Sequence, residues 1–438
     1  MPNTGLSDYI PKFDCYHPNA IVLPIQGENW QLDAKHSGNL LRSKTDRHDV
    51  DLSQHVNWLW PKKTLYFISD AHADADAFIA SLVATGTVLK TGTGATDFVV
   101  NKASQDATYI IGGDCLDKGP SNLQLLDALQ HLRQSNVKVK LLAGNHDMRL
   151  LMGLQSLQGK KDTLTEHLFV RMGNKVVPLL KEVYELYVKD KPTSPSLPSS
   201  KECRKRLFPG DDWFQKFPLA ATLLTSESVE RELNRMENKI ASFEKSCLKS
   251  GLTILDVYAT ALKCQELFLD KNGQYGWFFD SMKLIYRKGA FLFLHAGVDD
   301  TICKQINEFG IKDINQRYQQ LVKKDLFSFY YGTLANSLRT KYRPVDMPLT
   351  EEGVNIFKNE GLHFIVHGHK NRKQGQRIVN QNGIIHIEAD ITLDRNSRKK
   401  EGLCGIGMGA TIIHPDRRIV GISNDYPYAK VFDPRHYI

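Results

Sequence analysis

Short apolar runs alternate with amphipathic stretches from Thr64 onward, and this alternation predicts the start of a βαβαβ unit. The runs TLYFIS (64–69), ATYIIG (107–112) and KVKLLA (138–143) have the length of buried strands, and residues 74–86 and 122–134 between them have helical spacing. Further strand-length apolar runs lie at 289–298, 363–369, 383–390, 409–415 and 418–423. The C-terminal part of the chain is therefore predicted to be rich in strands.

The alternation stops after Asn145 and resumes at 289–298, so residues 151–285 are predicted to be a mainly helical insertion. The segment KPTSPSLPSSKECRKR (191–206) has the composition of a loop, because its three prolines interrupt a regular helix. Residues 226–270 are expected to form an antiparallel helical hairpin. Its first helix has apolar positions at the heptad spacing of a coiled coil, namely Val229, Leu233, Met236, Ile240, Phe243 and Cys247.

The remaining ranges divide the chain further. Residues 1–60 show no clear period, and we expect an irregular N-terminal segment that packs on the body through Trp30, Trp58 and Trp60. Residues 61–150 and 286–438 are expected to form one main domain of the α/β (α+β) class.

Composition restricts the functional class. The chain has 438 residues, is 41% hydrophobic and carries a formal charge of +8 with dispersed Lys and Arg, which favours anionic ligands and does not indicate a nucleic-acid surface. Seven scattered cysteines without a CxxC pair predict reduced thiols. No segment has the length of a membrane span or the pattern of a signal peptide. We expect a cytoplasmic protein, or one delivered into a host cell by a non-classical secretion system.

Polar side chains follow the predicted strands at the end where α/β sheets place their ligands. Asp70 and His72 lie two apart in FISDAHAD, so in extended chain they face the same side and could bind one metal ion, although a lone D-x-H is more often a helix-capping Asp with a surface His. Asp114 and Asp117 lie three apart in GGDCLDKG, where a carboxylate could bridge two cations or form an ordinary turn.

Three more clusters follow later strands. In LLAGNHDMR, Asn145 offers a neutral oxygen ligand and His146 is a candidate proton donor. His295 ends the run FLFLH, and His367 and His369 end HFIVHGH. A single histidine of this kind is usually a hydrogen-bonded core residue, but together they complete a ligand set of imidazole and carboxylate groups suited to Mn, Fe or Zn.

In this order the motifs D-x-H, G-D-x-x-D-x-G, G-N-H-D, H-A-G and G-H resemble those of the calcineurin-like metallophosphoesterases, especially the phosphoprotein phosphatase (PPP) branch. The resemblance covers residues 64–423 apart from the insertion, and it implies a β-sandwich flanked by helices. It also implies two divalent metal ions, most often Mn. On this resemblance the metal ligands are Asp70, His72, Asp114 as the bridge, Asn145, His295 and His369, with His367 as an alternative ligand, and His146 with Asp117 forms the acid pair.

The chain departs from the branch at three positions. Lys118 stands where the branch usually has Arg, Asp147 where Glu is more frequent, and Ala73 where Gly is frequent. With these departures the motif set resembles that of atypical bacterial members of the branch. Those members include tyrosine-directed phosphatases and Legionella Wip-type effectors with a helical hairpin insertion. Lys118 keeps the positive charge but loses the bidentate fork of Arg.

The expected reaction is phosphomonoester hydrolysis of a phosphorylated protein, with phosphotyrosine favoured over phosphoserine or phosphothreonine. A metal-bridging hydroxide would attack phosphorus while His146 protonates the leaving group as general acid. Lys118, Arg149 and, with less support, Arg343 are candidates to bind the substrate phosphate, although each arginine could equally form a surface ion pair. Cys115 lacks a partner base and flanks a carboxylate, which disfavours a cysteine nucleophile.

Two other functions stay open at this point. The same metal centre could hydrolyse phosphodiesters or dinucleoside polyphosphates. Alternatively, the chain could act as a scaffolding protein through a protein partner at the helical hairpin, for which a lid or packing arm is the simpler interpretation.

Overall fold

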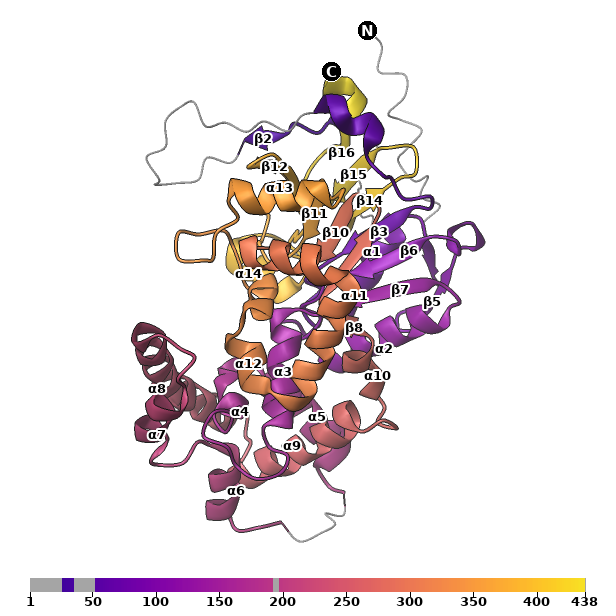
Figure 1. Ribbon diagram of the computed structural model, residues 1–438. Coiled ribbons are helices and arrows are strands. Elements are labelled where there is room, and N and C mark those ends of the chain that lie inside the picture. The colour runs from indigo at the N-terminus through magenta and orange to yellow at the C-terminus, as the bar shows by residue number, and fades with distance from the viewer. Residues whose placement is uncertain (1–25, 35–51, 192–196, 438) are drawn as a thin grey trace.

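Two large sheets lie together in the upper half of the molecule as drawn in Figure 1. The computed structural model describes residues 26–34, 52–191 and 197–437. The larger sheet has eight strands in the order β1–β16–β15–β14–β3–β6–β7–β8. Their bounds are Gly27–Asn29 (β1), Leu65–Ile68 (β3), Thr108–Ile111 (β6), Lys138–Leu142 (β7), Met282–Lys283 (β8), Gly409–Ile413 (β14), Ile419–Ser423 (β15) and Ala429–Phe432 (β16).

The second sheet has six strands in the order β2–β12–β13–β11–β10–β9. Their bounds are Asp33–Ala34 (β2), Ile285–Lys288 (β9), Phe291–Leu294 (β10), Phe364–His367 (β11), Arg377–Gln381 (β12) and Ile384–Glu388 (β13). A separate pair joins β4 (Val88–Lys90) to β5 (Phe98–Val100). In each large sheet the central strands are parallel: β3, β6 and β7 in one, and β10, β11 and β13 in the other.

Apolar side chains from both sheets meet in one core, so the sheets form a sandwich. Phe67 of β3 and Phe293 of β10 have ring centroids 6.0 Å apart, and Phe291 stacks on Phe364 at 4.3 Å. Strands β6, β10, β11 and β13 are buried along their whole length, as expected for parallel strands covered on both faces. The predicted α/β sandwich flanked by helices is confirmed.

The helices cover the sandwich and extend beyond it. Their bounds are Ala75–Ala84 (α1), Asn122–Gln134 (α2), Asn145–Gln155 (α3), Leu168–Arg171 (α4), Val177–Val183 (α5), Ser200–Leu207 (α6), Trp213–Ala220 (α7), Ser226–Lys249 (α8), Ile254–Leu269 (α9), Gly276–Asp280 (α10), Asp300–Lys324 (α11), Leu326–Tyr331 (α12), Glu351–Asn359 (α13) and Arg395–Glu401 (α14). Short 3-10 turns are η2 (Leu52–Asn57), η3 (Lys102–Ser104), η4 (Gly173–Lys175), η6 (Thr333–Leu338) and η7 (Pro434–Tyr437), and η5 (Tyr184–Val188) is a π-helical turn.

Two of these helices confirm the sequence pattern closely. Helix α1 begins after Asp74, whose carboxylate accepts the N–H of Ala77, and α2 begins after Ser121, whose hydroxyl accepts the N–H of Gln124. Both helices start within one residue of the predicted range. Because each follows a parallel strand directly, the loops between strand and helix lie at the carboxyl edge of the sheet.

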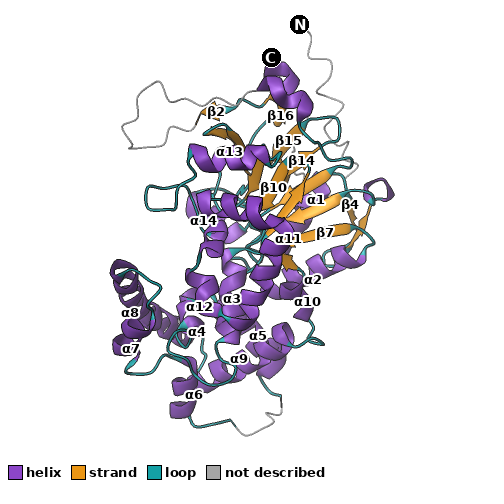
Figure 2. Ribbon diagram, in the orientation of Figure 1, coloured by secondary structure: helices purple, strands orange, loops and turns teal. Residues whose placement is uncertain are grey.

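The segment between β7 and β8 is helical, and Figure 2 shows helices α4 to α9 on the side of the molecule away from most of the strands. Both helices predicted at 226–270 are present as α8 and α9, but each packs mainly against other elements and not against the other helix. Helix α8 packs mainly against η4 and α4, whereas α9 packs against α6, η5, α3, α5 and α10. The heptad seam is satisfied by other helices: Met236 packs in a cluster with Trp213, Phe217 and Phe327.

The loop predicted at 191–206 is also corrected in part. Residues 200–207 form α6, which Ser199 caps by accepting the N–H of Glu202, because the prolines all precede the helix and leave its hydrogen bonds intact. Residues 192–196 lie outside the described residues.

The N-terminal segment is tied to both sheets where it is described. Strand β1 pairs with β16, β2 pairs with β12, and the buried Trp58 packs edge-on against Phe364. Within the described ranges, no helix has the length and apolar character needed to span a bilayer. The described cysteines are free thiols, and five of the six are buried.

Candidate metal centre and acid pair

The site residues lie in loops at the carboxyl ends of parallel strands from both sheets. Asp70 and His72 follow β3, Asp114 follows β6, Asn145 follows β7, His295 follows β10 and His369 follows β11. Left-handed backbone is concentrated here, with φ of 57° at Asp70, 52° at Asp114 and 64° at His369. Non-glycine residues adopt this region at a cost of about 1–3 kcal/mol each, a strain that typically persists at functional sites.

Two glycines allow these loops to approach one another. A Cβ added at Gly144 would lie 1.9 Å from the backbone nitrogen of Asp114, and one added at Gly368 would lie 2.0 Å from Oδ2 of Asp70. Any side chain at either position would therefore displace a carboxylate-bearing loop.

The first donor group consists of Asp70, His72 and Asp114, whose ligand atoms lie within 4.8 Å of one another. Nε2 of His72 is 3.8 Å from Asp70 Oδ1 and 3.8 Å from Asp114 Oδ2. The other ring nitrogen, Nδ1, lies 3.1 Å from the carbonyl of Leu116, which orients the ring. Nε2 lies 2.6 Å from Lys118 Nζ, and burial, followed by the Lys118 charge, lowers the pKa of His72 to about 3, so the imidazole is neutral, as a metal ligand must be.

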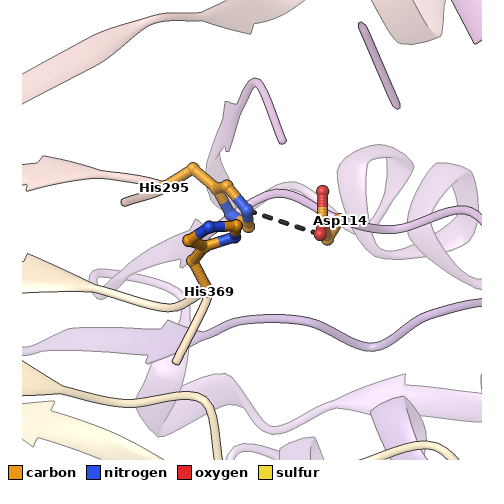
Figure 3. A group of neighbouring side chains, drawn as sticks. All are labelled: Asp114, His295 and His369. Carbon is orange, nitrogen blue, oxygen red and sulfur yellow. Dashed lines mark ion pairs between the residues drawn. The ribbon is translucent and has the colours of Figure 1, made fainter. Parts of the chain in front are cut away.

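The second donor group consists of Asp114, His295 and His369, which Figure 3 shows converging from separate segments. Nε2 of His295 lies 3.4 Å from Asp114 Oδ2 and 3.2 Å from Asn145 Oδ1, while its Nδ1 lies 2.9 Å from the carbonyl of Gly112. The backbone N–H of His369 donates to Asp70 Oδ2 at 3.0 Å, which links this group to the first.

His367 lies outside both donor groups found among the described residues. It is fully buried beside His386, with ring centroids 5.7 Å apart, and its Nδ1 lies 3.0 Å from the carbonyl of Gly368. The geometry therefore brings His369 into the cluster and leaves His367 as a neighbour.

Asp114 belongs to both groups, so the donor set fits two cations that share one carboxylate. Burial opposes its charge, yet His295 and His146 hold the pKa of Asp114 well below its usual range. Conversely, burial works against protonation of His295, but Asp114 raises its pKa to about 10. The buried carboxylates thus demand positive charge at this place, which divalent cations would supply.

The predicted acid pair is assembled. Nδ1 of His146 lies 2.8 Å from Oδ2 of Asp117, and the backbone N–H of His146 donates to Asp114 Oδ1 at 2.8 Å. Nε2 of His146 is 3.9 Å from Asp114 Oδ2, so the ring lies beside the carboxylate that both donor groups share. Burial raises the pKa of Asp117 to about 7 and holds that of His146 well below its usual value.

Asp147 has a role that the sequence pattern did not reveal. Its fully buried Oδ1 accepts the backbone N–H groups of Cys115 and Leu116 at 3.0 and 3.1 Å, and Oδ2 accepts that of Gly144 at 3.1 Å. It therefore fastens the loop after β6 to the start of α3. The position of Asp147 directly after His146, in the first turn of a helix, is the signal that could have indicated it.

Asp390 was also missed. It follows β13, as His367 ends the neighbouring parallel strand β11, and its side chain is buried with Oδ1 accepting the N–H of Thr392. Burial and the nearby Asp70 charge raise its pKa well above the usual range. The acidic residue at the end of the apolar run GIIHIEAD is the signal that could have indicated it.

The three candidate phosphate-binding cations have different surroundings. Lys118 contacts His72 directly. Arg149, in the second turn of α3, is close enough to Asp117 that its charge opposes the rise in the pKa of that carboxyl. Arg343 instead forms a bidentate pair with Asp346, at 3.2 and 2.9 Å, and its side chain is 58% exposed.

Cys115 is unsuited to nucleophilic chemistry. It is fully buried, and burial together with Asp147 and Asp114 raises the pKa of its thiol well above the usual value. The thiol stays protonated, in agreement with the sequence interpretation.

The chain belongs to the calcineurin-like phosphoesterases, because the sequence pattern of that family matches residues 63–373. It is thus a metallophosphoesterase, a hydrolase of phosphoric esters. Curated protein sequences show no match to it.

Solved structures that align with this chain include a cold-active protein tyrosine phosphatase at 14% identity and a TM-score of 0.42. The alignment covers 92% of this chain and 88% of that chain. Another is the cold-active protein-tyrosine phosphatase of a psychrophilic Shewanella species at 13% identity and 0.39, covering 93% and 91%. A Saccharomyces cerevisiae serine/threonine phosphatase with similarity to human PP5 matches at 13% identity and 0.37, covering 85% and 80%.

Proposed function

We propose that this protein is a metal-dependent phosphomonoesterase of the PPP branch that acts on phosphorylated protein, with phosphotyrosine favoured. The observation that carries the proposal is the His146–Asp117 pair at 2.8 Å, held by a backbone hydrogen bond to the shared carboxylate of Asp114. His146 would thus lie beside the metal ions that hold the phosphoryl group, where a general acid can protonate the leaving oxygen.

The ligand assignment follows from the two donor groups. Asp70, His72 and Asp114 would hold one cation, and Asp114, Asn145, His295 and His369 the other. When bound, the two divalent cations, for which we propose Mn, neutralise charge on the phosphoryl group and activate the attacking water. Imidazole and carboxylate ligands suit Mn, Fe and Zn alike, so metal analysis decides among them.

His146 would act as the general acid. The hydrogen bond between Asp117 and Nδ1 of His146 orients the imidazole ring. Nε2 of His146 is then free to protonate the leaving oxygen as the P–O bond breaks. Burial keeps the imidazole neutral in the free protein, but the negative charge of a bound phosphate ester favours its protonated form. Arg149 and Lys118 would bind the phosphate oxygens, and Asp147 would hold the loop that carries Asp114 and Asp117.

The preference for phosphotyrosine rests on the set of departures from the usual PPP motifs, of which Lys118 is one. A lysine binds phosphate as a point charge, without the planar two-pronged contact that the usual arginine makes. The long, flat phosphotyrosine side chain also reaches a buried centre more readily than the short phosphoserine side chain. Arg343 remains a weaker candidate, since Asp346 must release it first.

Steady-state kinetics on phosphotyrosine, phosphoserine and phosphothreonine peptides, with Mn returned after chelation, test the proposal. We expect activity only after metal is restored, with the highest kcat/KM on phosphotyrosine. A dinucleoside tetraphosphate serves as the competing substrate. Preference for it over every phosphopeptide would replace the proposal by a polyphosphate hydrolase, and full activity of metal-free protein would end the metal assignment.

A further inference from the structure

Three cations from separate segments lie near one another, and two of them come from the helical insertion. Arg149 belongs to α3, Lys175 ends the turn η4, and Lys239 lies on α8, which packs on η4. Nζ of Lys239 lies only 2.6 Å from the point where a Cβ at Gly173 would stand. Gly173 has φ of 67° and no side chain, so it provides the space into which the lysine folds.

These cations lack acidic partners in the part of the chain that the structure describes. Among the described residues, the nearby ion pairs are His146–Asp117 and Arg171–Glu232, and neither includes one of these three cations. The half-buried Lys239 is affected by its neighbours: burial, Arg171, Arg149 and Lys175 lower its pKa to about 8. Gathering unpaired like charges is unfavourable in the free protein, and binding of an anion would relieve it.

Two of the cations, Arg149 and Lys175, are close enough to Asp117 of the acid pair to affect its charge. Arg149 and Lys175 both oppose the rise in the pKa of Asp117, which places their charges near that carboxylate. Asp117 bonds His146, and His146 faces the leaving oxygen in the proposed mechanism. The part of a phosphoprotein that carries the leaving oxygen therefore extends toward these cations.

We propose that Lys175 and Lys239, beside the phosphate-binding Arg149, form a basic rim that binds acidic side chains flanking the phosphorylated residue of the substrate. The inference rests on the proposed function and adds the class of substrate: phosphopeptides with Asp or Glu beside the phosphorylated residue. Helix α8 then contributes to substrate selection through Lys239. Carboxylates of the peptide pair with the rim by charge-assisted hydrogen bonds.

The variants Lys175→Ala and Lys239→Ala test the rim, with Lys239→Arg to restore the charge. Lys245→Ala is the matched control, because Lys245 is an exposed residue on the same helix α8. The substrates are p-nitrophenyl phosphate, a phosphotyrosine peptide with neutral flanks, and the same peptide with aspartate flanks. For each alanine variant we expect kcat/KM on the acidic peptide to fall about tenfold, with less than about twofold change on the other two substrates.

A binding measurement separates the rim from the proposed function. A fluorescein-labelled peptide of six aspartates, followed by anisotropy at low salt, should bind the wild-type protein and the Lys245→Ala control alike, and Lys239→Ala about tenfold more weakly. If the wild type hydrolyses no phosphopeptide, the proposed function fails while this binding result still decides the rim. Equal losses on all three substrates, or no loss on the acidic peptide, would overturn the rim.

Discussion

Glu232 and Arg171 form a buried ion pair that we expect to hold α8 in place. Glu232 is 3% exposed and Arg171 8% exposed, and the guanidinium donates through Nε to Oε1 and, at 3.4 Å, through Nη2 to Oε2. Arg171 is the last residue of α4, and only Met172 separates it from η4. Lys239 follows Glu232 by seven residues, two helical turns, and so lies on the same face of α8.

The perturbation is Glu232→Gln, which keeps the shape of the side chain but leaves the Arg171 charge buried without compensation. Removing one partner of a buried pair costs about 3–5 kcal/mol. If that cost is confined to the contact of α8 with α4 and η4, the free energy of local opening falls by the same amount. Amide exchange in residues 226–249 should then accelerate on the order of 100-fold or more.

Hydrogen-exchange mass spectrometry of residues 226–249 measures this acceleration, with Glu237→Gln as the control at an exposed position of the same helix. The double variant Arg171→Met/Glu232→Leu should regain most of the protection, because an apolar pair of similar volume is often as stable as a buried ion pair. Glu232→Gln should also weaken hydrolysis of the acid-flanked peptide while p-nitrophenyl phosphate turnover is kept. Unchanged exchange in Glu232→Gln would refute the reasoning.

Three further predictions concern the acid, its support and a remote histidine. His146→Ala should lower kcat about 10²- to 10⁴-fold on an alkyl phosphate and much less on p-nitrophenyl phosphate, whose leaving group needs little protonation, with metal content unchanged. Asp147→Asn should lower the unfolding free energy by about 1–3 kcal/mol, since its amide cannot accept all three N–H groups; an unaltered melting temperature would contradict this. Burial lowers the pKa of His167 in the folded protein to about 3. The neutral imidazole therefore contributes fully to stability above the pKa of the unfolded chain, about 6.5, and the contribution declines as pH falls toward 3. At pH 5 the loss of unfolding free energy is about 2 kcal/mol. His167→Phe, which keeps a ring against both Trp213 and Phe217, should reduce the loss of stability between pH 7 and pH 5 by that amount. An identical loss in both proteins would count against this prediction.

The proximity of the donor side chains could be expected from the sequence, because each of them follows a predicted buried strand in a short motif. Asp70, Asp114 and His295 each follow a buried strand directly, and parallel strands bring their carboxyl ends to one edge. The position of a motif at a strand end therefore indicates which edge its side chain occupies, even where 299 residues separate hydrogen-bonded partners such as Asp70 and His369. The choice of His369 over the neighbouring His367 came from the family resemblance. The order of the strands within the sheets did not need to be known.

The insertion was predicted less well because its contacts depend on tertiary packing. A heptad stripe such as the one containing Met236 shows which face of a helix is buried, but any apolar surface can cover that face. Here the cover is Trp213 and Phe217 of α7 with Phe327 of α12, and not α9. Arg343 is a different case: Asp346, three residues on, offered a local partner that competes with any phosphate.

The two parts of the site have different origins, and this difference constrains function. Strand-end loops, strained at residues such as Asp114 and fastened by Asp147, form the part that would carry out the chemistry. Lys239 belongs to none of the sequence motifs. It lies beside Gly173 only because α8 packs on η4 in the folded protein. Changes in α8 should therefore alter which phosphopeptide is hydrolysed, while turnover of a small aryl phosphate, which needs only the strand-end loops, stays nearly constant.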